Sequence, residues 1–180
     1  MLNNGKAKIE NSAGTLSIII PSKKNWFALL FGTAWLGGWY FGLTNVLTSF
    51  GKSDNDNIGV DGFITFWLVG WTIGGLAIIF ILLWGYFGQE KIISDRNELL
   101  FEKTIFNIGL KKRMDVREIR NFRTEKVMTG MFGNNGYAFW GLGPGKIKFD
   151  YGLKTYSFAL GVDDAEANHL VEILNAYFKK

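Results

Sequence analysis

The chain has 180 residues, no cysteine, one histidine and a net charge of +4. The lack of cysteine excludes disulfides, thiol catalysis and cysteine-based zinc sites, and His169 alone argues against a multi-histidine metal or haem site. Aromatic residues make up 16% of the chain and include seven tryptophans, which is high for a soluble protein but natural for one with membrane interfaces. The length suffices for two membrane helices and one small domain.

The first 24 residues predict a short β segment. Lys8–Glu10 and Thr15–Ile20 read as strands around the turn residues 11–14. An isolated hairpin is marginally stable in water. We therefore expect this segment to pair with strands that follow the membrane region and to belong to the same domain.

Two long runs without any charged residue follow, Trp26–Leu47 and Phe63–Phe87. Each exceeds the roughly 20 apolar residues that a helix needs to cross a membrane. We therefore expect residues 25–88 to form a transmembrane helical hairpin, with spans at about 26–47 and 63–87. The lack of charged side chains in the spans argues against proton or ion translocation through this chain.

The charge distribution predicts the orientation. Four lysines against one glutamate precede the first run, one lysine against three aspartates lies in the Thr48–Gly62 loop, and fifteen basic against twelve acidic residues follow the second run. Basic residues near a span favour the cytoplasmic side. This pattern predicts a protein of the bacterial inner (cytoplasmic) membrane with both termini in the cytoplasm.

Small residues recur at helical spacing in both runs. Because glycine lets helix backbones approach closely in lipid, these positions are candidates for helix packing. They are Ala34, Gly38 and Gly42 in the first run and Gly70 and Gly74 in the second. Two interpretations stay open: the faces pack the hairpin against itself, or one of them docks a helix of another protein.

Residues 89–180 predict several short antiparallel strands closed by a C-terminal helix. The expected strands cover residues 91–94, 98–105, 110–116, 118–127, 146–151 and 154–160. Asp163 is expected to cap the helix, with Glu166 completing a capping-box-like pair. Residues 170, 173, 174, 177 and 178 give the helix an apolar stripe. This order is typical of a small β-barrel or sandwich plugged at one end.

Several stretches resemble the core of bacterial pleckstrin-homology-like domains. They are Ile92–Phe101, Gly109–Arg113 and Val116–Ile119, with Phe149–Gly152 and Leu160–Ala167 similar to the end of such domains in small two-span bacterial membrane proteins. The resemblance implies a membrane helical hairpin inserted in a small antiparallel β-barrel or sandwich closed by a C-terminal helix. It implies scaffolding or assembly rather than chemistry.

No catalytic constellation emerges, so we expect neither an enzyme nor a cofactor. Asp163, Asp164 and Glu166 near His169 are explained by the favourable charge of a helix start. A basic run holds candidate lipid-headgroup ligands, since each charge near anionic lipid contributes about 1 kcal/mol. These candidates are Lys111, Lys112, Arg113 and Arg117. The alternative is a solvated strand face, and the modest charge disfavours nucleic-acid binding.

The glycine-rich segment Val127–Gly145 is the candidate partner-contact site. Its apolar side chains are interrupted by glycines, so a regular strand cannot bury all of them, and aromatic and Met residues are typical interface anchors. The candidate contact residues are Met128, Met131, Phe132, Tyr137 and Trp140. A strand around Tyr137–Trp140 would bury part of them instead.

These observations favour a non-enzymatic, membrane-anchored adaptor, an accessory or assembly subunit of a larger inner-membrane complex. Its expected partners are other integral membrane subunits, with no nucleic acid. The alternative is a protein that binds or senses anionic lipid through its basic face and the groove between the spans.

Overall fold

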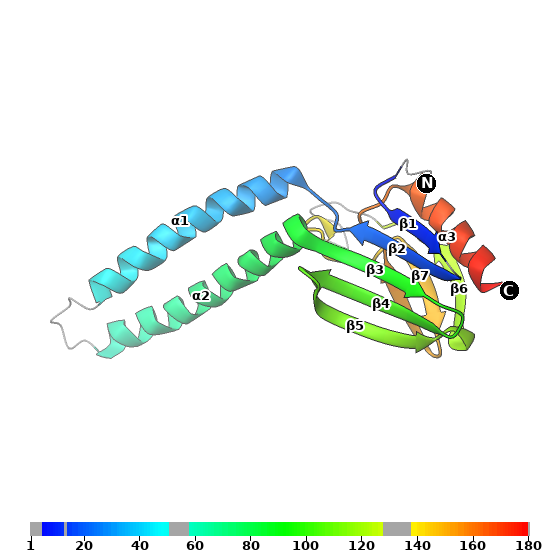
Figure 1. The fold of residues 1–180 in the computed structure, drawn as a ribbon. Coiled ribbons are helices and arrows are strands. Elements are labelled where there is room, and N and C mark those ends of the chain that lie inside the picture. Colours follow the sequence, from blue (N-terminus) through cyan, green and yellow to red (C-terminus); the bar gives the residue numbers. More distant parts are fainter. Residues whose placement is uncertain (1–4, 13, 51–57, 128–137, 180) are drawn as a thin grey trace. The chain divides into compact units, whose positions relative to one another are not determined.

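The structure is a computed structural model that describes residues 5–12, 14–50, 58–127 and 138–179. The chain divides into two compact units (Figure 1). The β unit comprises Met1–Asn25 and Leu83–Lys180, and the helical unit comprises Trp26–Leu82. The helical unit is therefore inserted between two parts of the β unit.

The first sheet of the β unit has five antiparallel strands in the order β1-β2-β3-β4-β5. Its strands are β1 (Lys8–Ser12), β2 (Thr15–Pro21), β3 (Gly88–Ser94), β4 (Glu98–Ile105) and β5 (Ile108–Asp115). The sequence-based prediction that the N-terminal segment pairs with later strands is confirmed, because β2 pairs with β3, with Ile18 opposite Ile92.

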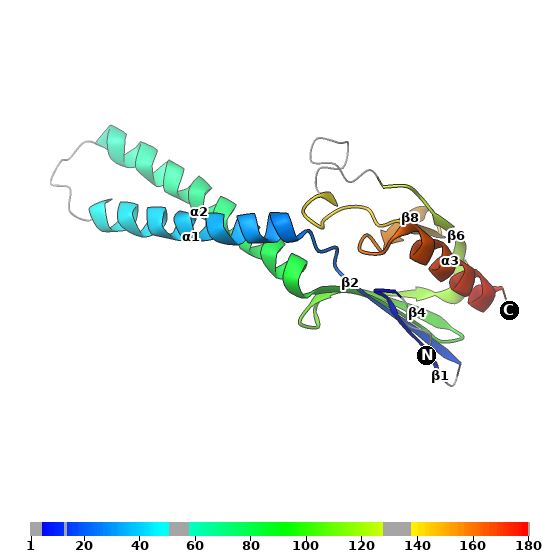
Figure 2. The ribbon, with the colours of Figure 1, turned by 90° about the horizontal axis from the view of Figure 1, so that it is seen from above.

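The second sheet has three antiparallel strands, β6 (Ile119–Thr124), β7 (Ile147–Tyr151) and β8 (Lys154–Phe158), and the 3₁₀ turn η1 (Val116–Glu118) precedes it. Helix α3 (Asp164–Phe178) packs against β6, and Figure 2 shows the two elements close together. Phe122 of β6 stacks on Phe178 of α3 at 5.1 Å between ring centroids.

The core of the β unit lies between the two sheets and α3. The alternating pattern of β2 places Leu16, Ile18 and Ile20 on the inner face, where each is at most 1% exposed. Four phenylalanines form a cluster of ring contacts in this core. They are Phe101, Phe122, Phe149 and Phe158. Burial of such side chains contributes about 1.5–3 kcal/mol each, so strands from both sides of the inserted helices share one core.

The start of α3 follows the expected capping only in part. Asp163 Oδ1 accepts a hydrogen bond from Glu166 N at 2.8 Å, which satisfies one of the free N–H groups of the first turn. The Glu166 carboxylate accepts instead from the backbone N–H of Ala7, at 2.7 Å. The N–H of Ala7 thus takes the place of the N–H of Asp163 as the donor to Glu166. This hydrogen bond connects the residues before β1 to α3.

The helical unit contains α1 (Trp26–Phe50) and the greater part of α2 (Ile58–Phe87). Trp39 Nε1 donates to the carbonyl of Trp71 at 2.9 Å, and Trp67 stacks on Trp71 at 4.6 Å. A Cβ added at Gly75 would collide with the indole of Trp39. The two helices therefore contact each other through tryptophans of α1 and α2 and the small surface of Gly75.

The predicted two-span hairpin is wrong. Among the described residues, only Gly62–Phe87 is a helix long and apolar enough to cross a membrane. Helix α1 is long enough, but glycines, tryptophans and the polar residues Thr33, Thr44 and Asn45 dilute its apolar character. Absence of charge, on which the prediction rested, is a weaker criterion than sustained apolarity. The sandwich part of the predicted fold is present.

Candidate functional site

The end of the five-stranded sheet at which α2 passes into β3, the α2 end, is closely tied to other parts of the β unit. The last helical residues, Leu83–Phe87, belong to the β unit themselves. Ser22 Oγ donates to the carbonyl of Gly85 at 3.0 Å, and Trp84 Nε1 donates to the carbonyl of Gly141 at 2.9 Å. Both bonds are buried, so they hold the exit of α2 against the segment before α1 and the turn at Gly141.

The turn Ala138–Gly141 packs at this end. Lys23 Nζ donates to the carbonyl of Ala138 and Asn25 Nδ2 to that of Phe139, both at 3.3 Å. Burial, with smaller contributions from the charges of Lys146 and Lys6, lowers the pKa of Lys23 below its usual value of 10.5. The lysine is therefore built into the structure as a donor to this turn.

Only part of the predicted partner-contact segment can be placed. Trp140 is half-buried and makes an edge-on contact with Phe139 at 5.6 Å. The strand expected around this residue is instead a turn. The other predicted contacts lie outside the described residues. They are Met128, Met131, Phe132 and Tyr137.

The β4–β5 turn lies at the same end. Its two central residues are Phe106 (φ 51°) and Asn107 (φ 65°). A left-handed conformation is uncommon for a bulky side chain. The Phe106 ring meets the Phe87 ring of α2 at 4.6 Å, so the turn adjoins the helix exit.

A pocket of about 480 Å³ opens beside this contact. Its lining includes Lys24, Lys91, Tyr86 and Phe106. Lys91 Nζ donates to Asn107 Oδ1 at 2.7 Å, which places a cation at the turn. The pocket therefore combines lysines with aromatic rings where α2 leaves the β unit.

The predicted lipid-headgroup residues are distributed along β5 and the following turn η1 rather than gathered in one site. Lys111 Nζ lies 3.1 Å from Glu102 Oε1, and Lys112 lies over the ring of Tyr156 at 4.4 Å and donates to its hydroxyl. Arg117 pairs with Asp115 at 2.7 Å. Hydrogen bonds from Arg117 lower the pKa of Asp115 to about 2. Three of the four cations thus have partners within the β unit.

Their position in the strand also weighs against a shared headgroup site. β5 begins next to the turn at the α2 end and runs away from it. At about 3.4 Å per residue, Arg113 lies roughly 17 Å along the strand from Ile108. This distance exceeds the Debye length of about 8 Å at physiological salt. The four cations are therefore spread along the chain rather than clustered, and their headgroup role stays a prediction.

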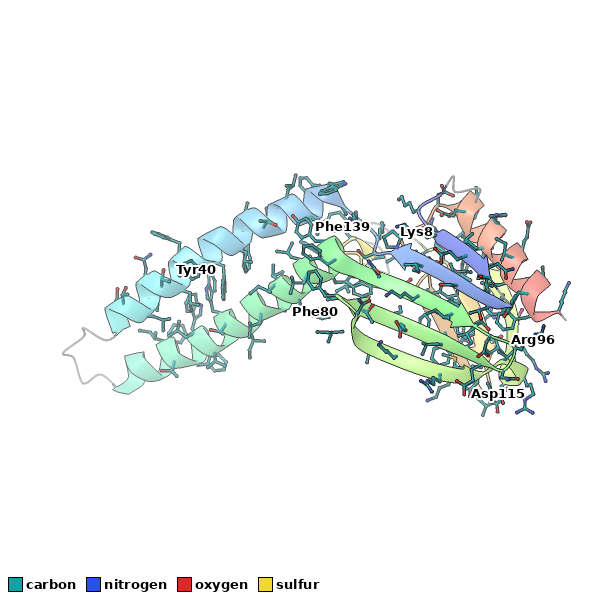
Figure 3. All side chains as sticks on the ribbon, viewed as in Figure 1. Lys8, Tyr40, Phe80, Arg96, Asp115 and Phe139 are labelled. Atoms are coloured by element: carbon teal, nitrogen blue, oxygen red, sulfur yellow. The ribbon has the colours of Figure 1, made fainter. Side chains whose placement is uncertain are left out.

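The opposite end of the sheet, the far end, carries a larger hollow of about 750 Å³. The hydroxyl of Tyr177 on α3 lies here within hydrogen-bond distance of the carbonyl oxygens of Gly14 and Ser94, at 2.6 and 2.9 Å, and its single proton serves both acceptors. The lining is mostly apolar, and its charged residues are Asp95 and Arg96. It includes Leu16, Arg96, Val116, Ile173, Tyr177 and Phe178. Figure 3 shows Arg96 and Asp115 at this end.

The small residues predicted to pack helices have little contact in this structure. A Cβ added at Gly38, Gly70 or Gly74 would meet no heavy atom within 4 Å, and Ala34 is exposed. At Gly42 the added Cβ would lie 3.8 Å from Trp71. The glycines that do let the helices approach are Gly32, beside Leu82, and Gly75, beside Trp39. Packing of the hairpin against itself therefore does not explain the predicted faces.

The described residues contain no group of three or more His, Asp or Glu side chains placed to hold a metal ion. Asp163 caps α3, and Asp164 pairs with Lys146 at 2.7 Å. His169 is exposed on α3. These side chains thus have structural explanations where the structure describes them.

No protein-family model matches the chain, and no curated protein matches it either. The resemblance to pleckstrin-homology-like domains therefore stays a prediction from short motifs. The structure adds one surface that sequence reasoning missed, the β4–β5 turn. Its signal was present in the apolar residues Phe106, Ile108 and Leu110, which stand where turn residues are usually polar.

Proposed function

We propose that this protein is a non-enzymatic, membrane-anchored adaptor, an accessory or assembly subunit of a larger complex in a bacterial inner membrane. Helix α2 is its anchor, and the β unit is the part that grips partner subunits. The observation that carries the proposal is the direct passage from the apolar helix into a sheet strand. Phe87 ends α2 and Gly88 begins β3, so no linker separates anchor and domain.

The insertion of the helical unit supports a holding role. In the sequence, this unit comes between β2 and β3, which are hydrogen-bonded neighbours in the sheet. The anchor therefore cannot leave the domain without disrupting its core. A domain fixed in this way beside a membrane suits the positioning of other subunits, because it limits the conformational freedom lost on binding.

The hollow at the far end is the proposed partner site. It lies at the end of the sheet remote from the exit of α2, where a partner subunit has access. Its apolar lining and the exposed Arg96 match the usual composition of interface anchors, in which arginine and aromatic residues are enriched. A partner segment with an acidic residue next to apolar side chains fits this chemistry.

The β unit is proposed to face the cytoplasm. Both ends of the described chain belong to this unit, so a cytoplasmic β unit carries both termini on that side. Lys24 and Lys91, which line the pocket beside the last turn of α2, support this orientation because basic residues near a span favour the cytoplasmic side.

Purification of the tagged full chain in mild detergent tests the adaptor proposal. We expect integral membrane subunits to co-purify in fixed stoichiometry. Arg96→Glu should reduce their recovery, whereas Arg120→Glu, a matched charge reversal on the exposed side of β6, should not. A monomer that carries only anionic lipid would refute the adaptor and favour the lipid-binding alternative.

A further inference from the structure

We propose that the β4–β5 turn is a second membrane contact, which inserts its apolar side chains into the lipid interface next to the exit of α2. The inserted side chains are those of Phe106, Ile108 and Leu110. The inference rests on the proposed function in one respect, namely that α2 is embedded in a membrane. It goes beyond that function by assigning a lipid-contacting surface to the β unit itself.

The first support is the exposure of these side chains. Phe106 is 62%, Ile108 80% and Leu110 79% exposed. They lie within five consecutive residues at one tip of the sheet. Farther along the sheet, on the same face as Ile108 and Leu110, Leu99 and Phe101 of β4 are buried. A cluster of large apolar side chains on a protein surface is costly in water unless it meets lipid or another protein.

The second support is continuity with the helix. Phe106 contacts Phe87 at 4.6 Å, and Phe87 and Leu83 are themselves exposed on the last turns of α2. The apolar surface of the turn therefore continues the apolar surface of the helix. Since Phe87 is the last residue of the segment able to cross a membrane, a bilayer that surrounds α2 ends close to this turn.

The third support is the charge beside the turn. Lys24 and Lys91 line the pocket that Phe106, Asn107 and Tyr86 share. Lysines extend their ammonium groups toward headgroup phosphates while aromatic rings favour the level of the headgroups. This arrangement fits the interfacial layer of a bilayer. A protein that covered the turn instead would need a concave apolar surface, and it would have to fit beside α2 where the headgroups of the bilayer lie.

The backbone conformation of the turn does not by itself favour an apolar residue at position 106. Two-residue hairpin turns with positive φ at both central positions prefer Asn-Gly or related pairs. Here Phe106 takes the first of these positions. Turn formation alone therefore does not account for the phenylalanine, whereas contact with α2 and lipid does.

The chain contains no cysteine, so a single cysteine can be introduced and labelled with an environment-sensitive nitrobenzoxadiazole probe. The full chain with Ile108→Cys is reconstituted into mixed phosphatidylcholine and phosphatidylglycerol vesicles. Vesicles with lipids brominated on their acyl chains then measure contact with the bilayer. Leu153→Cys is the matched control. Leu153 is likewise an exposed aliphatic residue at a hairpin turn, but this turn joins β7 and β8.

We expect brominated lipid to quench the probe at position 108 at least twofold more strongly than at position 153. The probe at 108 should also emit at shorter wavelength in vesicles than in detergent-free unfolded protein. Equal quenching at the two positions would overturn the inference. Weak quenching at 108 together with shielding that appears only when partner subunits are added would assign the turn to a protein interface instead.

A separate readout keeps the two proposals distinguishable. Resistance of each labelled chain to alkaline carbonate extraction reports on the anchoring of α2, independently of the probe. An embedded chain without quenching at position 108 refutes only the inference about the turn. A chain that carbonate extracts refutes the anchor, and quenching at 108 in floated vesicles would then show that the turn binds lipid without it.

Discussion

Truncation of Ile18 to alanine should strongly destabilise the β unit, although the residue precedes the inserted helices by several positions. Ile18 is fully buried in β2 and opposes Ile92 of β3. Ile19, the next residue, lies on the outer face and is half-buried. Ile18→Ala and Ile19→Ala therefore form a matched pair that removes the same atoms from the two faces of one strand.

The magnitude follows from burial. Removing three buried carbon atoms costs about 2.4 kcal/mol of transfer free energy at about 0.8 kcal/mol per methylene. The residual cavity adds about 1 kcal/mol at 24 cal/mol per Å³ if the site relaxes only in part. We expect a loss of about 3–4 kcal/mol in the free energy of unfolding for Ile18→Ala. The half-buried Ile19 should lose about 1 kcal/mol.

Urea unfolding of the full chain in mild detergent, read by brief proteolysis of the unfolded fraction, measures the two free energies. This readout follows the β unit and does not depend on the tryptophans of α1 and α2. Equal losses for Ile18→Ala and Ile19→Ala would refute the reasoning. They would mean that the N-terminal strands do not contribute to a core shared with the later strands.

Further substitutions test individual contacts. Gly75→Ala should loosen the helix pair by about 1–3 kcal/mol through overpacking against Trp39 and reduce the near-ultraviolet circular dichroism of the tryptophans, whereas Gly74→Ala should leave it unchanged. Glu90→Gln should cost about 2–3 kcal/mol, because this buried carboxylate bonds both a backbone N–H and a lysine; an unchanged urea midpoint would contradict this. Hydrogen bonds, first from Arg123, lower the pKa of Asp150 from 3.8 to about 2, so its stabilising contribution is present above pH 4 and is lost as pH falls toward 2. Asp150→Asn should therefore flatten the acid limb of stability between pH 4 and 2, and an unaltered limb would refute the assignment.

Much of the β unit could be predicted because its signals are local. The alternation Leu16, Ile18, Ile20 marks an inward face, and the N-terminal segment needs partners because a hairpin alone is unstable. Asp163 before an apolar stripe predicts the start of the C-terminal helix, and the structure confirms the cap. Glu166 could not be assigned in advance, because its partner Ala7 is distant in sequence.

The helical unit and the surfaces were harder to predict. Small-residue spacing marks faces at which helices can approach, but it does not say which glycine meets a large side chain. In the structure Gly75 accepts the Trp39 indole while Gly74 faces outward. The headgroup prediction counted cations over residues 111–117 without their partners. In the structure Lys112 bonds Tyr156, and Arg117 pairs with the nearby Asp115. Side-chain pairing of this kind depends on tertiary packing rather than on sequence spacing.

Alkaline carbonate extraction of membranes from cells that express the full chain at its natural level tests the membrane anchor, on which the adaptor depends. The 26-residue segment Gly62–Phe87 is long and apolar enough to lie within the bilayer core and should resist this treatment. We therefore predict that the chain stays in the membrane pellet together with its partner subunits. Release of the chain into the supernatant, as for a peripheral protein, would contradict the account.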